Sequence, residues 1–94
     1  MDVIATRRFE LDQDSMPTWV IISIGRPYRA DELTDEWRAN VQVVFPDRVM
    51  NRTVFGSDSF QALILACKQG KLEIESLQVA FGERITWQGE TSLW

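Results

Sequence analysis

Residues 36–45, EWRANVQVVF, show the clearest pattern in the chain, an alternation of apolar and polar side chains that holds through Val43. This period of two is typical of a strand with one buried face and one face in water. Such a strand must pair with other strands, and its apolar face must be covered by another element. The residues expected to face inward are Trp37, Ala39, Val41, Val43 and Phe45. The pattern therefore predicts an antiparallel sheet that is covered on one side.

Other segments supply the partners of this strand. Residues 3–11 alternate except at Arg7, residues 18–25 are apolar on both faces, and residues 48–55 follow a Pro46–Asp47 turn. Residues 84–88 predict a short last strand, and residues 89–94 are expected to form a loose tail.

The long apolar stretch after residue 58 predicts the covering element. Apolar residues at helical spacing predict a helix from residue 59 to about 78, with a buried stripe of Phe60, Leu63, Ile64, Cys67, Ile74 and Leu77. Gly70 either interrupts this helix or lets it approach the sheet closely. The expected fold is α+β, a single domain over residues 1–94, with a four- to five-stranded antiparallel sheet in the order β-β-β-β-α-β. One long helix packs on one face of this sheet.

Charge and cysteine content limit the classes of partner. The 94 residues carry a net charge of −4, which disfavours binding to nucleic acid because contacts with phosphates dominate such affinities. No apolar run approaches the ~18 residues of a membrane span, and the segment MDVIATRRFEL lacks the pattern of a signal peptide. We therefore expect a cytoplasmic protein with no nucleic-acid or membrane partner.

The stretch GSDSFQALILAC, residues 56–67, has two interpretations. A glycine and small polar residues before a helix can form a phosphate-binding loop, but the second glycine and the lysine of a Walker-type loop are missing. The preferred interpretation is a helix cap. Gly56 would turn the chain with a positive φ, Asp58 would be the N-cap, and Gln61 would complete a capping box.

Residues suited to catalysis or metal binding are scarce. Histidine is absent and Cys67 is the only cysteine, so the sequence predicts no enzyme, no metal site and no cofactor. Cys67 itself is expected to be a buried, unreactive thiol on the apolar stripe of the helix. Among the tryptophans, only Trp94 has no expected place in the core.

Four segments are similar to a known family: IATRRFEL, EWRANVQV, FGSDSFQALILA and ITWQG. In this order they resemble a family of small bacterial proteins known only as a domain of unknown function. The family often has a cysteine two residues after the Trp-Arg pair, where this chain has Ala39 or Asn40. The resemblance implies a bacterial, single-domain protein and supplies no activity, substrate or site.

Two functions remain open at this point. The first is a non-enzymatic protein-interaction module, similar to an immunity protein or an adaptor, and its oligomeric state is open. Its candidate interaction surface combines an arginine, an acidic loop and a tryptophan, namely Arg38, Glu36, Asp31, Glu32, Asp35 and Trp94. Arg52 is excluded because a two-residue turn at 46–47 would put it on the Val41 side of the sheet. The alternative is a regulatory or ligand-binding domain with a pocket between helix and sheet.

Overall fold

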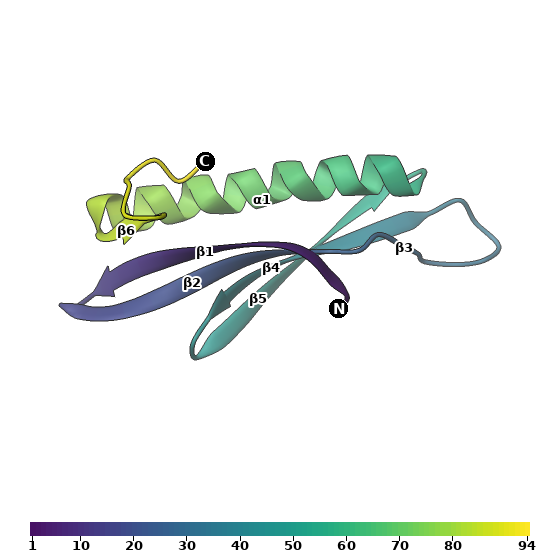
Figure 1. Cartoon of the computed structure of the whole chain (residues 1–94). Helices are drawn as coiled ribbons and strands as arrows, with labels where there is room; N and C mark the ends of the chain where they lie inside the picture. Colours follow the sequence, from purple (N-terminus) through teal and green to yellow (C-terminus); the bar gives the residue numbers. More distant parts are fainter.

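The computed structural model describes residues 1–94 and shows one antiparallel sheet with one long helix across it (Figure 1). The elements in chain order are β1 (Val3–Gln13), β2 (Met16–Gly25), β3 (Tyr28–Arg29), β4 (Trp37–Phe45), β5 (Arg48–Gly56), α1 (Ser59–Phe81), a 3-10 turn (Gly82–Arg84) and β6 (Ile85–Thr86). The predicted fold class is confirmed. Between the strands predicted at residues 18–25 and 36–45 the structure has one more short strand, β3, so the order becomes β-β-β-β-β-α-β.

Each strand pairs antiparallel with its neighbours. β1 pairs with β2 and β6, while β4 pairs with β2 and β3 along one edge and with β5 along the other. Asp14 and Ser15 have φ of 52° and 63° and form the two-residue turn between β1 and β2. The pairing of Val41 with Arg52 confirms that Arg52 lies on the buried side of the sheet.

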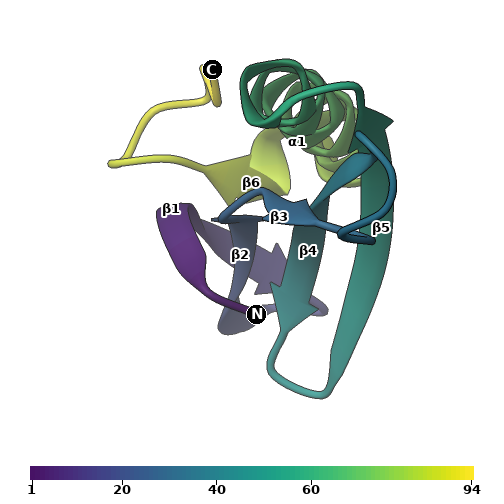
Figure 2. The ribbon, with the colours of Figure 1, turned by 90° about the vertical axis from the view of Figure 1, so that its right-hand side faces the viewer.

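The helix covers one face of the sheet (Figure 2), and its buried stripe differs from the predicted one. Small residues in its first half, Ala62, Ala66 and Gly70, face the sheet. A Cβ added at Gly70 would lie 3.1 Å from Ile24 Cδ1, so this glycine permits close contact and the helix continues through it. The predicted stripe is confirmed at Ile74 and Leu77, which are buried. It was wrong at Phe60 and Ile64, which are 72% and 40% exposed, because the small residues allow a closer approach than large ones.

The helix begins with a side-chain cap. Asp58 Oδ1 accepts a hydrogen bond from the backbone N–H of Gln61 at 2.7 Å. Gln61 Oε1 accepts from the backbone N–H of Ser57 at 2.7 Å, one residue before the position that a capping box uses. Gly56 does not have the expected positive φ. Its role is spatial, since an added Cβ would lie 2.6 Å from the backbone N of Ala62.

The C-terminal segment differs from the loose tail that was expected. Gln88 and Gly89, with φ of 53° and 79°, form a tight turn that brings Glu90 back to pair with Trp87. Leu93 is only 2% exposed and belongs to the core. The amide of Gln78 on the helix also donates to the carbonyl of Thr91.

Candidate functional site

One edge of β1 is without a strand partner over much of its length. β6 pairs with β1 only at Glu10 and Leu11. The chain then turns away at Gln88–Gly89, so no strand continues the pairing alongside residues 3–8 of β1. Backbone N–H and C=O groups on this edge remain available to another strand.

The helix also leaves this part of β1 uncovered. α1 packs most extensively on β5 and β4, less on β2, and least on β1 (Figure 2). Three hollows lie along the uncovered part of β1 and the neighbouring side of the helix. The first, of about 470 Å³, is lined by Thr6, Arg7, Arg8, Glu10, Trp87 and Gln88. The second, of about 160 Å³, lies between helix and strand and is lined by Ala5, Thr6, Arg7, Ile22, Ile24, Cys67, Gly70, Ile74 and Trp94.

The third hollow, of about 340 Å³, runs along the helix and is lined by Leu63, Ile64, Cys67, Lys68, Lys71 and Trp94. Neighbouring hollows share lining residues: Thr6 and Arg7 join the first to the second, while Cys67 and Trp94 join the second to the third. They form one elongated depression, which we call the β1 groove.

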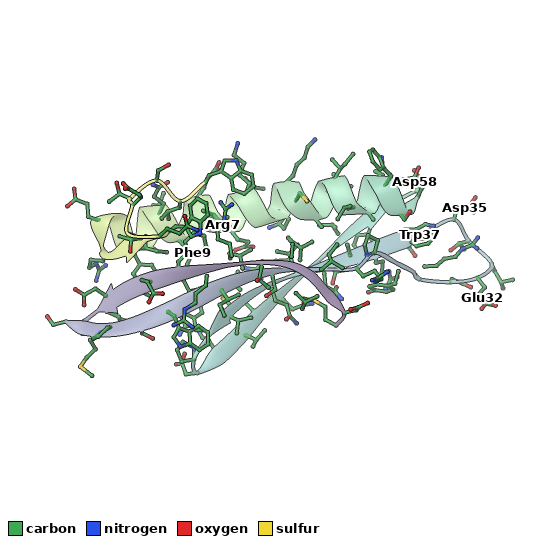
Figure 3. The ribbon with its side chains drawn as sticks, viewed as in Figure 1. Arg7, Phe9, Glu32, Asp35, Trp37 and Asp58 are labelled. Carbon is green, nitrogen blue, oxygen red and sulfur yellow. The ribbon has the colours of Figure 1, made fainter.

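Arg7 lies where the first two hollows meet, between β1 and the C-terminal segment (Figure 3). Its guanidinium carbon is 3.8 Å from the ring centre of Trp87 and 5.8 Å from that of Trp94. Its Nη1 donates to the carbonyl of Leu93 at 3.0 Å. These contacts hold the guanidinium in place through rings and a carbonyl, with no carboxylate to neutralise its charge.

The other cations show how unusual this is. Each of six arginines pairs with a carboxylate of the chain: Arg8, Arg26, Arg29, Arg38, Arg48 and Arg52. Four cationic side chains have no such partner, and three of them, Arg7, Lys68 and Lys71, line the β1 groove. The fourth, Arg84, donates to backbone carbonyls at the end of the helix. An acidic chain therefore concentrates its unpaired positive charge in one groove.

Cys67 and Trp94 lie at the junction of the second and third hollows. Cys67 is exposed, and the expectation of a buried thiol was wrong because the helix presents Ala66 and Gly70 to the sheet in its place. Trp94, 61% exposed, forms a wall of the groove, and the ammonium of Lys71 lies 5.5 Å from its ring centre.

The surface proposed from the sequence is divided by the fold. Glu32 and Asp35 lie in the loop at the far end of the molecule from Arg7 (Figure 3). Asp31 accepts from the backbone N–H of Leu33, and Asp35 pairs with Arg29 at 3.3 Å. Trp94 belongs to the β1 groove and is not part of this loop.

Arg38 is itself engaged within the chain. It pairs with Glu36 at 3.3 Å, and its guanidinium carbon is 5.2 Å from the ring centre of Phe55. Its Nε is buried and has no hydrogen-bond partner. The predicted surface therefore consists largely of charges that already have partners.

Sequence reasoning missed Arg7 as a site residue, although the signal was present. Arg7 was the one charged residue on the apolar face of the first strand. Its partners Trp87 and Trp94 lie about 80 residues further along the chain, so only the fold shows that they surround it.

The described residues contain no group of three or more His, Cys, Asp or Glu side chains placed to hold a metal ion. No helix of the chain is both long and apolar enough to cross a membrane.

Comparison with curated proteins and with solved structures finds no significant match. Comparison with protein families finds one, and it extends over residues 5–93, which is nearly the whole chain and includes every residue that lines the three hollows except Trp94. The chain therefore belongs to the family described as a domain of unknown function, DUF6968.

Proposed function

We propose that this chain is a non-enzymatic protein-interaction module and that its partner docks in the β1 groove. The observation that carries the proposal is the placement of Arg7, Lys68 and Lys71. All three line the β1 groove, and none has a carboxylate partner in the chain. Charged groups without an internal partner are available for complementary contacts with another molecule. The bacterial origin and cytoplasmic location expected from the sequence belong to the same proposal.

The composition of the groove supports a protein partner. Trp94 and Arg7 are residue types that interfaces favour, and the hollow between helix and strand is lined mainly by apolar side chains. Trp94 was also among the interaction residues expected from the sequence. The charge of the groove favours an acidic partner, which differs from the basic partner of a toxin-neutralising immunity protein.

The alternative of a small-molecule site has less support from the geometry. The hollow between helix and sheet has about 160 Å³, and sites that enclose a small molecule have roughly 300–1,000 Å³. The larger hollows lie on either side of it along the surface, so the groove as a whole is long and shallow. Such a shape suits several side chains of a protein better than one enclosed ligand.

The exposed Cys67 provides a direct test, since it is the only cysteine and lines the groove. A maleimide–benzophenone attached to Cys67 should, on irradiation in a lysate of the native cell, form a covalent adduct with one discrete protein. Changing Arg7 to glutamine in the labelled protein should reduce the yield of that adduct, because the groove would lose one of its free charges.

A control label on the opposite region makes the result specific. Asp47 lies in the exposed turn between β4 and β5, so Asp47→Cys in a Cys67→Ser background carries the same reagent away from the groove. Adducts of equal yield from both positions, or no adduct from Cys67, would show that the groove is not a docking site.

A further inference from the structure

We propose that the partner enters the β1 groove as an extended, acidic segment that pairs as an added strand with the free edge of β1. This inference rests on the proposed function and names the class of partner. It follows from three features of the groove, namely its backbone edge, its shape and its charge.

The backbone edge is the first feature. The pairs Glu10–Thr86 and Leu11–Ile85 set an antiparallel register between β1 and β6. A segment continuing the line of β6 beyond the Gln88–Gly89 turn would lie opposite residues 3–8 of β1. Main-chain hydrogen bonds to an exposed strand edge are a common means of binding extended peptides.

The shape is the second feature. The hollow lined by Thr6, Arg7 and Trp87 lies beside the edge of β1, where β6 stops. It continues into the hollow beneath Trp94, whose volume of about 160 Å³ fits single side chains. Val3 and Ile4 on the same strand are 45% and 43% exposed, so apolar surface continues along the edge. In strand addition, backbone hydrogen bonds usually supply the affinity, and hollows that accept alternate side chains supply the specificity.

The charge is the third feature, and it selects an acidic segment. Arg7 belongs to β1 and lines the two hollows beside this strand, while Lys68 and Lys71 belong to the helix and line the third hollow. Because these cations have no carboxylate partner in the chain, carboxylates on one face of the added strand could pair with them. Hydrogen bonds between charged groups are about twice as strong as those between neutral groups, so such contacts would favour an acidic segment.

A second copy of this chain is a poorer occupant. The long strand edges that it could offer are those of β1 and β5, since the edge strands β3 and β6 have only two residues each. Within its unpaired residues 3–8, β1 carries Arg7 and Arg8 and no acidic residue, and β5 carries Arg48 and Arg52 and no acidic residue. Neither edge would bring a carboxylate of its own strand to the cations of the groove, and the pairing of two β1 edges would also bring the two copies of Arg7 toward each other, which is unfavourable because like charges across a strand pair are destabilising.

Arg7 could also serve to block edge pairing, as inward-pointing charges do in other sheets. That role would not require Lys68 and Lys71 to stay unpaired on the facing helix. The two roles give different results in the experiment below, because a blocking residue weakens the binding of an added strand and a recognition residue strengthens it.

The test uses synthetic peptides of about seven residues, the length of an ordinary strand. Glutamate occupies every second position and valine or threonine the others. In a first control set, lysine replaces glutamate. In a second control set, every other backbone amide is N-methylated, which removes hydrogen-bond donors that strand pairing needs. Binding is followed by ¹⁵N-resolved NMR titration of the whole chain and by amide hydrogen exchange.

We expect the glutamate peptides to bind at least about tenfold more tightly than the lysine peptides. N-methylation on the edge-facing amides should cost a similar factor, and alternate amides within residues 3–8 should exchange more slowly in the complex. Arg7→Gln should weaken binding, and Arg84→Gln, which removes the unpaired cation outside the groove, should leave it unchanged.

Four results would overturn the inference: no binding by any glutamate peptide, equal binding of both charge sets, binding without protection of the β1 amides, or tighter binding by Arg7→Gln. Slow exchange of these amides in the free protein together with a dimer in sedimentation would identify a second copy as the occupant and would also overturn it. The Cys67 cross-linking result is independent of these measurements. An adduct at Cys67 without peptide binding would keep the groove as the docking site and reject strand addition.

Discussion

Arg7 and Arg38 are both half-buried arginines on strands, and each guanidinium lies beside an aromatic ring. Arg38, on the outer face of the sheet, also has the carboxylate of Glu36 at 3.3 Å. Arg7, on the helix side, has two tryptophan rings and the carbonyl of Leu93 but no carboxylate. The same residue type is therefore neutralised within the chain in one region and left charged in the other.

The difference shows why a list of charged residues does not identify a docking surface. A charge that already has an internal partner must give up that contact before it can serve another molecule, so its net gain is small. The acidic loop and Arg38 are largely in this situation, whereas the β1 groove is not. Four predictions contrast the two regions.

The largest expected difference concerns the two leucines of these regions. Leu93 is 2% exposed in the core beneath the groove, and Leu33 is 92% exposed in the acidic loop. Leu93→Ala should lower the free energy of unfolding by about 2–5 kcal/mol, because it leaves a cavity. Leu33→Ala should change it by less than about 0.5 kcal/mol. Urea unfolding followed by tryptophan fluorescence measures both, and equal effects would mean that the C-terminal segment is not docked.

The second contrast concerns two arginine–glutamate pairs. Arg52 Nε donates to Glu73 at 3.0 Å, and Glu73 is only 8% exposed. Arg52→Ala would leave this buried carboxylate with Gln69 as its remaining partner, so we expect a loss of about 1–3 kcal/mol. The pair of Arg38 and Glu36 is 40% and 43% exposed, and Arg38→Ala should cost about 0–1 kcal/mol. A larger loss for Arg38 than for Arg52 in the same unfolding assay would contradict this order.

The third contrast compares peptide binding by two variants that have the same net charge. Lys68→Gln with Lys71→Gln removes two positive charges from the groove, and Arg38→Glu changes the net charge equally on the outer face. At roughly 0.5 kcal/mol for each exposed charge contact, the double variant should bind the glutamate peptides about fivefold more weakly. Arg38→Glu should bind as the wild type does.

Fluorescence anisotropy with labelled peptide gives these dissociation constants, and circular dichroism checks that each variant is folded. If Arg38→Glu weakened binding by more than about 1 kcal/mol while the double variant did not, the outer face would be the docking surface, as the sequence had suggested.

The smallest expected effect concerns Cys67. Because its thiol is exposed in the groove, the rate of reaction with a thiol reagent should be similar in folded and urea-unfolded protein, within about a factor of three. The single cysteine makes the measurement unambiguous. A much slower reaction in the folded state would place Cys67 on the buried face of the helix. Slow reaction that becomes fast only in Leu93→Ala would instead show that the C-terminal segment covers it.

The strands and the helix could be predicted because their signals are local. Alternation in residues 36–45 and the short turn at 46–47 are visible in a few consecutive residues, and they also place Arg52 correctly beside Val41. The cap at Asp58 is likewise a relation between neighbours. Such features depend only on residues that are close in sequence.

The helix face that packs on the sheet could not be read in the same way. Large apolar residues and small ones form two stripes at helical spacing, and hydrophobicity alone favours the large ones. The sheet instead meets Ala62, Ala66 and Gly70, because small residues let the two backbones approach closely. This choice exposes Cys67 and produces the wall of the groove.

The sequence by itself therefore determined an α+β chain with a one-sided sheet, a capped helix and an isolated arginine at position 7. Only the tertiary structure decided what surrounds that arginine. The β1 groove exists because β6 ends at a turn and because the helix packs mainly on β4 and β5. In addition, burial of Leu93 in the core holds the C-terminal segment beside the helix. Each of these is a contact between segments distant in sequence, and such contacts depend on the shape and register of the whole sheet.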